Sequence, residues 1–288
     1  MRVEKFEVQK IQKVSEFISE RYKTLSYNSI RKLLRQKDIK VNDKRIKEDV
    51  LLSVGDSVSV YLPDSESFNL KVVFEDENVI VVFKPRKIET VSEQGESDLI
   101  KAVSDYLNSE CYAVHRLDRN TEGLVIFAKN NDAKKSLDIA IKKRKIEKFY
   151  LALVNGVLSK DSDDMIAYLK KDSKKAIVDV VDEPKEGYEK IETKYKILKI
   201  NNDVSLVEVE LVTGKTHQIR AHFAHIGHFV IGDEKYGDSK INKIFKSRYQ
   251  NLCAYKLVFH FESGDFLSYL DGKVVEVDKS KIKFCQNL

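Results

Sequence analysis

One short run of the sequence combines the residue types of an acid–base or nucleophilic site. Asp118 stands between Arg116 and Arg119 in a polar turn that leads directly into the apolar stretch at residues 124–127. Polar turns at the ends of strands often carry binding or catalytic groups. A carboxylate there can attack an electrophilic carbon or remove a proton. It can equally be a turn residue that pairs with Arg116 or Arg119, and the turn alone does not decide between these interpretations.

Two other patterns suggest chemistry that their spacing argues against. Residues 213–216 read Thr-Gly-Lys-Thr, like the end of a phosphate-binding P-loop, but Val209 occupies the position that needs the first glycine. Four histidines gather in one segment, but their spacing does not place them all on one helix face, and the glutamate of a helical zinc motif is absent. They are His217, His222, His225 and His228. We therefore expect neither nucleotide hydrolysis nor a metal site.

Hydrophobic spacing predicts the elements that must position the Asp118 turn. Strands are expected at residues 79–83, 124–128, 150–154, 194–200 and 204–212, and helices at residues 98–107, 132–145 and 216–225. A hairpin turn at residues 201–203 joins the last two strands, and residues 182–189 form a surface loop. Successive hairpins with a few helices between them favour an α+β fold with a mixed, largely antiparallel sheet and flanking helices.

The first sixty residues form a separate, basic segment. Helical spacing near residues 14–22 and 30–34, the latter with Ser26 as N-cap, is followed by a small sheet that reaches residue 62. Cations between residues 31 and 47 outnumber acids, which is typical either of a solvated helix face or of a surface that binds RNA phosphates. The candidate RNA contacts are Arg31, Lys32, Arg35, Lys37, Lys40, Lys44 and Arg45. A second cluster, at residues 142–145 with Lys148, is explained equally by RNA contact and by the helix dipole.

Composition limits the class of protein. The chain has 288 residues, 42% of them hydrophobic, which is enough for roughly two domains. The net charge is only +5, so a phosphate-binding surface must come from local clustering of cations. The three cysteines lie far apart, no apolar run approaches the ~20 residues that span a bilayer, and no secretory signal follows Met1. We expect a soluble, cytoplasmic monomer with no membrane contact.

Four segments resemble one enzyme family in order along the chain. Residues 115–123, His-Arg-Leu-Asp-Arg-Asn-Thr-Glu-Gly, resemble the active-site motif of the RluA-type pseudouridine synthases. Residues 76–85 resemble that family's opening strand and Lys-Pro turn, residues 148–156 its tyrosine strand, and residues 211–237 its third motif. The resemblance covers about residues 72–260. It implies a pseudouridine synthase-like fold and the isomerisation of uridine to pseudouridine in RNA, with no cofactor and no metal.

The resemblance also implies roles for individual residues. Asp118 is the catalytic carboxylate, either as a nucleophile at C1′ or as the base that removes a sugar proton. Arg220 pairs with Asp118, on the same helix face as His217. Tyr150 stacks on the base, and its hydroxyl could help to remove the C5 proton, whereas the strand pattern alone favours core packing. Because the uridine must leave its stack to react, Arg116 is expected to fill the vacated space.

Further substrate contacts are expected around these residues, in a pocket that excludes water. They are His115, Thr121, Thr216, His217 and Lys84. Two positions depart from the family pattern: Glu122 replaces the usual serine and adds a negative charge near the RNA, and Lys215 replaces the usual arginine, so no specific contact is assigned to it. Neither change touches Asp118, Tyr150 or Arg220, so activity should survive.

The segment at residues 12–62 resembles an S4-type RNA-binding domain. The expected organisation is therefore an S4-like domain at residues 1–62, a linker at residues 63–71 and a pseudouridine synthase catalytic domain at residues 72–288. The expected partner is structured RNA, and the expected substrate is large-subunit (23S) ribosomal RNA, because S4-bearing members of the family mostly act there. Transfer RNA modification and a catalytically silent RNA-binding or ribosome-assembly protein remain as alternatives.

Overall fold

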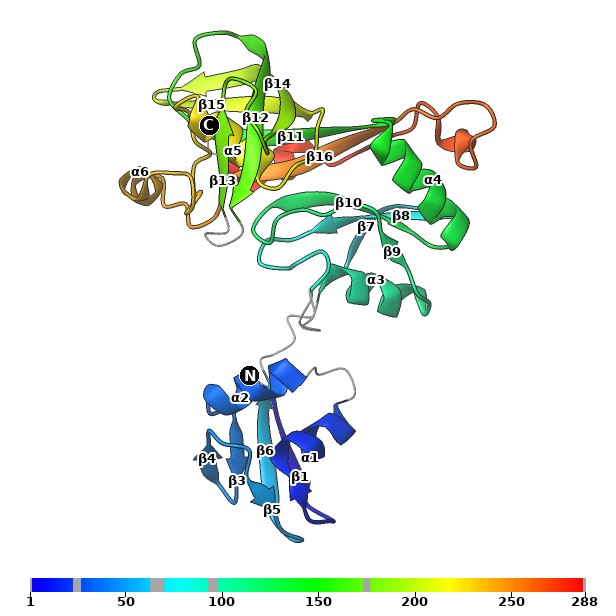
Figure 1. Ribbon diagram of the computed structural model, residues 1–288, viewed down its shortest axis with the longest axis vertical. Helices are drawn as coiled ribbons and strands as arrows, with labels where there is room; N and C mark the ends of the chain where they lie inside the picture. The colour runs from blue at the N-terminus through cyan, green and yellow to red at the C-terminus, as the bar shows by residue number, and fades with distance from the viewer. Residues whose placement is uncertain (1, 23–26, 63–69, 93–97, 173–176, 287–288) are drawn as a thin grey trace. The chain divides into compact units, whose positions relative to one another are not determined.

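A computed structural model describes residues 2–22, 27–62, 70–92, 98–172 and 177–286 (Figure 1). The chain divides into two units, one made of Met1–Asn69 and Val91–Ala102, the other of Leu70–Thr90 and Val103–Leu288. No helix among the described residues is both long and apolar enough to cross a membrane.

The smaller unit packs two short helices on small sheets. Its elements are β1 (Arg2–Glu7), β2 (Gln12–Lys13), α1 (Val14–Arg21), α2 (Tyr27–Arg35), β3 (Ile39–Val41), β4 (Lys44–Ile46), β5 (Leu51–Leu52) and β6 (Ser57–Leu62). One sheet has the order β1-β6-β3-β4, and β2 pairs with β5. Phe17 and Ile18 of α1 and Ile30 of α2 are buried in one core with Ile39 and Val60. Both helices are thus where the spacing predicted them, while Ser26 lies outside the described residues.

The first strand corrects the expected order of elements in this unit. The sequence predicted helices first and a sheet after them, whereas β1 precedes α1 and pairs with β6 along its whole length. Its alternation is hard to recognise in the sequence, because Val3 is exposed and charged residues surround Phe6.

The larger unit is built on one long sheet. Its strands are β7 (Lys71–Glu75), β8 (Val79–Lys84), β9 (Tyr112–Ala113), β10 (Glu122–Ala128), β11 (Ile146–Asn155), β12 (Ser162–Asp172), β13 (Ile177–Val181), β14 (Glu189–Asn201), β15 (Val204–Leu211), β16 (Leu252–Phe259) and β17 (Val274–Glu276). The order is β13-β12-β14-β15-β11-β16-β10-β8-β7, with β17 beside β16 and β9 beside β10. Only β10 and β16 pair in parallel among the described strands. The mixed, largely antiparallel sheet is confirmed.

Two helices, α4 (Asn131–Lys142) and α5 (Gln218–His225), lie against this sheet. The other helices after β8 are α3 (Leu99–Leu107), whose first residues belong to the smaller unit, α6 (Ser239–Ile244) and α7 (Lys283–Gln286), with 3-10 turns η1 (Ser268–Leu270) and η2 (Lys279–Lys281). Leu137 of α4 packs with Leu124 and Ile126 of β10, while Ala221 of α5 packs with Ile191 of β14. In Figure 1, α5 lies beside β12–β15 and α4 beside β10. The two halves of the sheet thus carry different helices, and the site forms between them.

Candidate active site

The Asp118 turn between β9 and β10 is held by its own backbone. The Thr121 N–H donates to the Asp118 carbonyl at 3.0 Å, and the N–H of Leu117 donates to the Thr90 hydroxyl at 3.2 Å. Gly123 follows with φ +130, and a Cβ there would collide with the backbone of Ala254 in the parallel strand β16. Only glycine fits this close approach, which brings the turn down onto the sheet.

Lys84 supports the same turn from inside the protein. Its ammonium donates to the carbonyls of Pro85, Ile88 and Arg119 at 3.0, 2.8 and 3.1 Å, and the side chain is fully buried. Burial lowers the pKa of Lys84 to about 7, although the charges of Asp118 and Glu122 act in the opposite direction. Lys84 lines neither hollow around Asp118. Three backbone carbonyls thus accept from Lys84, so the structure places it beneath the turn as a support and not at the cavity.

Arg220 links two carboxylates. Its Nη1 donates to Oδ2 of Asp118 at 2.8 Å, while Nε and Nη2 donate to Oδ2 and Oδ1 of Asp233 at 2.6 and 2.9 Å. Burial opposes the charge of Arg220, but the hydrogen bonds and charge of Asp233, and then Asp118, raise its pKa. For Asp233, burial alone would raise the pKa, but the hydrogen bond and the charge of Arg220 keep the pKa of Asp233 below its usual value. The planar guanidinium is thus fixed by Asp233 on one side and presents Nη1 to Asp118 on the other.

His217 completes the surroundings of Asp118. It is not in α5, as the sequence suggested, but is the residue before it, in the left-handed conformation with φ 54. Its Nε2 lies 4.0 Å from Oδ2 of Asp118, and its Nδ1 lies 2.8 Å from the hydroxyl of Tyr236. Burial lowers the pKa of His217. The charge of Asp118 acts to raise this pKa, and the charge of Arg220 acts to lower it. His217 and Arg220 therefore converge on one carboxylate, although only Arg220 lies within the helix.

Gln218 fixes the start of α5, and the sequence did not single it out. Its side-chain oxygen accepts from the Lys215 N–H and the Thr213 hydroxyl at 3.0 and 2.9 Å. Its amide donates to the Glu192 carbonyl and to the Thr193 hydroxyl, both at 3.0 Å. All four hydrogen bonds cross from the helix start to the preceding loop or to β14. Gln218 therefore ties the loop before Arg220 to the sheet.

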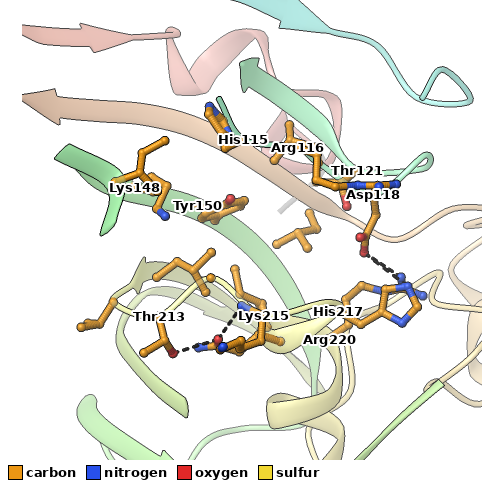
Figure 2. A pocket seen from close by; sticks show the side chains of 18 of the residues that line it. His115, Arg116, Asp118, Thr121, Lys148, Tyr150, Thr213, Lys215, His217 and Arg220 are labelled. Carbon is orange, nitrogen blue, oxygen red and sulfur yellow. Dashed lines mark hydrogen bonds and ion pairs between the residues drawn. The ribbon is translucent and has the colours of Figure 1, made fainter. Parts of the chain in front are cut away.

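A cavity of about 440 Å³ opens beside Asp118 (Figure 2). Tyr150 of β11 lines this cavity and is almost fully buried. Burial, followed by the charge of Asp118, raises the pKa of Tyr150, so its phenol is protonated at neutral pH. Asp118 also lines the cavity, but 27% of its side chain is exposed. The protein alone thus leaves the carboxylate partly in contact with solvent, not in the dry pocket that the sequence suggested.

A second hollow of about 490 Å³ shares Asp118, Arg116, His217 and Arg220 with the first. Its cations outnumber its acids, Asp118 and Glu234. They are Arg116, Arg119, Lys171, Lys215, Arg220, Lys235 and Arg248. Local clustering thus supplies the phosphate-attracting surface that the small net charge of the chain does not.

The remaining candidates take different positions. Arg116 is exposed and lines both hollows, and Thr216 is exposed at the second hollow. His115 lines the first cavity, but its Nε2 accepts the Ile126 N–H at 3.1 Å, and burial and the charge of Lys148 lower the pKa of His115 to about 3. Thr121 is buried, and its hydroxyl accepts from the Gln250 amide at 3.1 Å, so it shapes the turn.

The two departures from the family pattern are both paired. Glu122 accepts from Arg86 Nη2 at 3.1 Å, and little of its side chain is exposed. The negative charge of Glu122 is therefore paired with the positive charge of Arg86. Lys215 pairs with Glu189, a partner that the sequence did not suggest.

The clustered histidines bond to separate partners. His222 Nδ1 lies 3.0 Å from the Thr193 hydroxyl, His225 Nε2 lies 2.8 Å from Asp182, and His228 Nδ1 lies 2.8 Å from the Asn155 carbonyl. Among the described residues, no group of three or more His, Cys, Asp or Glu side chains could hold a metal ion.

The basic residues of the smaller unit are mostly at its surface. Arg31, Arg35, Lys37, Lys44 and Arg45 are exposed, and Lys40 is half-buried. The charged groups of Lys40 and Arg45 lie 5.2 and 4.8 Å from the centre of the Tyr61 ring. The side chain of Lys32 lies outside the described residues.

A carboxylate oriented by a buried arginine, between two hollows rich in cations, is suited to a ligand that carries phosphates, such as a nucleic acid. The family described as RNA pseudouridylate synthase matches residues 78–225. The chain is 32% identical to an uncharacterized RNA pseudouridine synthase of Aquifex aeolicus over 90% of this chain and 89% of that protein. It is 30% identical to ribosomal large subunit pseudouridine synthase C of Buchnera aphidicola over 88% of this chain and 85% of that protein.

A solved structure supports the fold. Human RNA pseudouridylate synthase domain containing 1 superposes with a TM-score of 0.58 at 24% identity, over 78% of this chain and 96% of that one. The chain belongs to the RNA pseudouridylate synthase family, and it is an RNA pseudouridine synthase, an isomerase. The resemblance seen in the four sequence motifs is thereby confirmed at the level of the family.

Proposed function

We propose that this enzyme converts specific uridines of large-subunit (23S) ribosomal RNA to pseudouridine. The relatives named ribosomal large subunit pseudouridine synthase C support this substrate. The observation that carries the catalytic part of the proposal is the 2.8 Å hydrogen bond from Arg220 to Asp118 at the edge of a cavity lined by Tyr150. Such a substrate implies a cytoplasmic enzyme, and we propose that it acts as a monomer without cofactor or metal.

Asp118 acts at the sugar of the flipped uridine. The N1–C1′ bond breaks, the base turns, a C5–C1′ bond forms and the C5 proton leaves. Asp118 assists by attacking C1′ or by removing a sugar proton, and both routes need its carboxylate form. Arg220 orients that carboxylate by donating to Oδ2, while the hydrogen bonds that Arg220 donates to Asp233 hold the guanidinium in place.

Tyr150 holds the base during the turn. Its ring provides an apolar surface on which the uracil stacks. The stacked nucleotide would itself cover the exposed part of Asp118, so the site would become dry only when RNA is bound. Because the phenol of Tyr150 is protonated, it first provides a stacking surface and a hydrogen-bond donor. It can accept the C5 proton only after it has lost its own proton.

The smaller unit provides a second RNA contact. We propose that residues 1–62 are an S4-like RNA-binding domain, that residues 63–71 are a linker and that residues 72–288 are the catalytic domain. Two helices packed on a small sheet, with exposed Arg31, Arg35, Lys37, Lys44 and Arg45, support this division. Phosphate contacts from such a surface would raise affinity without reading sequence.

Tritium release from RNA that carries C5-labelled uridine tests the proposal. We expect release from 23S ribosomal RNA lacking the modification, little release from transfer RNA, and a loss of roughly 10²- to 10⁴-fold or more in Asp118→Asn. Mapping pseudouridines in cellular RNA with and without the gene identifies the target. Release only from transfer RNA would overturn the ribosomal substrate. No release from any cellular RNA would instead indicate an RNA-binding or ribosome-assembly protein.

A further inference from the structure

A half-buried lysine, Lys148, shares the catalytic cavity but has no role in the site described above. Lys148 precedes Tyr150 by two residues on β11, so the two side chains lie on the same face of the strand. Both line the 440 Å³ cavity with Asp118. In Figure 2, Tyr150 lies between Lys148 and the pair formed by Asp118 and Arg220. The cavity thus has an acid at one end and an ammonium group at the other.

The ammonium of Lys148 has no acidic partner among the described residues. None of the ion pairs or side-chain hydrogen bonds found there involves its Nζ, and a Cβ added to Gly214 would lie 3.4 Å from it. Burial alone lowers the pKa of Lys148, whereas the charge of Asp118 contributes to the raised pKa of Tyr150. The charge of Asp118 therefore acts on Tyr150 but not on Lys148, so Asp118 is not the counter-ion of this lysine.

A charge that is largely withdrawn from water and has no counter-ion is unfavourable in a folded protein, and Lys148 is half-buried. Where such a group lines a cavity, its partner is commonly supplied by the ligand. Other cations of the cavity, Lys142 and Arg144, are exposed at its surface and are suited to phosphates. Lys148 lies deeper, beside the tyrosine on which the base would stack. The ligand group that reaches it should therefore be the base.

The reaction provides the missing negative charge. When the N1–C1′ bond breaks, its electron pair stays on the uracil ring and spreads over N1, O2 and O4. The pair returns to C1′ from C5 when the new bond forms, and the C5 proton then leaves. With Asp118 at the sugar and the ring stacked on Tyr150, the far edge of the ring would point along the cavity toward Lys148.

We propose that Lys148 binds the far edge of the uracil ring and stabilises the negative charge that the ring carries while it is detached from the sugar. This inference rests on the proposed function, because it uses Asp118 to place the sugar. Lys148 is then a specific electrostatic partner of the detached base and not one more phosphate contact. Its contribution appears only after the glycosidic bond begins to break, as expected of a group that stabilises charge developing in the reaction.

The test compares Lys148→Met and Lys148→Arg with Lys256→Met. Lys256 lies on the neighbouring strand β16, with its ammonium 4.0 Å from the centre of the Phe149 ring, and it lines neither hollow. Single-turnover conversion at saturating RNA is followed by digestion and chromatography, and RNA affinity by filter binding. Lys148→Met should lower the saturating rate roughly 10- to 100-fold with little change in affinity. Lys148→Arg should recover part of the rate, and Lys256→Met should match the wild type.

A substrate with 5-fluorouridine at the target position separates the possible roles. Fluorine makes the departing ring a better leaving group, so cleavage of its glycosidic bond should suffer less from Lys148→Met than cleavage of the uridine bond. Thermal unfolding checks the fold: removal of an unpartnered charge should leave the midpoint unchanged or raise it. Weaker binding with an unchanged saturating rate, or equal losses on the two substrates, would overturn the proposal. Inactive wild-type protein would instead contradict the proposed function itself.

Discussion

Nη1 of Arg220 lies 2.8 Å from Oδ2 of Asp118, although the two residues are 102 positions apart in the chain. The geometry of this contact is set by a third residue, because Asp233 binds the other two donor positions of the same guanidinium. Asp233 is fully buried, whereas Asp118 is partly exposed. The two carboxylates bound to Arg220 therefore have different roles: Asp233 holds the arginine in place, and Asp118 remains accessible to a ligand. A lysine could not serve both in this planar arrangement.

Asp233→Asn should damage both stability and catalysis. The change leaves Arg220 buried with a weakened partner, and breaking a buried pair costs on the order of 3 kcal/mol. The freed guanidinium would also present Nη1 less accurately to Asp118. Urea unfolding measures the free energy of unfolding, and single-turnover tritium release measures the rate. Glu189→Gln is the control, because it breaks the exposed pair with Lys215 and should cost less than about 1 kcal/mol. Equal losses in the two variants would contradict the prediction.

Lys84 should make stability depend on pH above neutrality. Its folded pKa is about 7, below the ordinary value of 10.5, so between these values the unfolded chain binds more protons than the folded one. The free energy of unfolding contributed by Lys84 therefore rises with pH across this window and is lost as pH falls toward 7. The slope is at most about 1.4 kcal/mol per pH unit.

Urea unfolding of the wild type and of Lys84→Met across this window measures the difference. The variant should be less stable overall, because the carbonyls around Lys84 lose their hydrogen-bond donor, and it should lack the upward slope. Parallel curves for the two proteins would show that Lys84 keeps an ordinary pKa.

The sequence predicted the pair at the centre of the site but not the structure behind it. Asp118, Tyr150 and Arg220 follow from motifs, because the chemistry fixes their residue types. Asp233 and Gln218 act through hydrogen bonds that exist only in the folded protein, and their spacing in the sequence does not predict those hydrogen bonds. For Lys84, the motif gave the position but not the direction of the side chain, which backbone acceptors determine.

Two of the strands that the sequence did not predict, β12 and β13, have a similar physical reason. In β12 and β13, the buried residues are Met165, Ala167, Leu169 and Val178, and Ile166 is exposed between two of them. Apolar residues thus stand on both faces of the strand, so alternation is weak in the sequence, and the sheet context decides the structure. The strands at 79–83 and 124–128 were clear because both of their faces are buried.

Arg116→Ala should separate folded from unstructured RNA. Arg116 is exposed beside Asp118 and lines both hollows, where its guanidinium can occupy the space that a flipped nucleotide leaves. Turnover on a folded ribosomal RNA fragment should fall several-fold more than turnover on an unstructured oligonucleotide, because only the first must be unstacked. Tritium release from both substrates gives the ratio. The same loss on both would remove this role from Arg116.

The smaller unit should contribute salt-dependent affinity. Arg35 and Lys44 are exposed, so their removal should not disturb the fold. The double variant Arg35→Ala/Lys44→Ala should bind RNA more weakly, and the slope of log affinity against log salt should fall by about 0.7–0.9 for each phosphate that is no longer neutralised. The rate at saturating RNA should not change. The matched control is Lys281→Ala/Lys283→Ala, which removes two exposed lysines that line neither hollow. An identical slope in both double variants would mean that Arg35 and Lys44 do not bind RNA.

Tyr150 combines a ring and a hydroxyl, and two substitutions separate them. Tyr150→Phe keeps the stacking surface, so RNA affinity and breaking of the glycosidic bond should change little. Because burial and the charge of Asp118 raise the pKa of Tyr150, its hydroxyl should add no ionisation to the pH–rate profile of the wild type near neutrality.

Tyr150→Phe should nevertheless slow the release of tritium from C5, because it removes the hydroxyl that takes part in the loss of that proton. Tyr150→Ala should also weaken binding of the base. Affinity and tritium release measured in parallel distinguish the two effects. If Tyr150→Phe released tritium at the wild-type rate, the ring alone would account for the contribution of this residue. The C5 proton would then have to leave through another group, such as Asp118 itself.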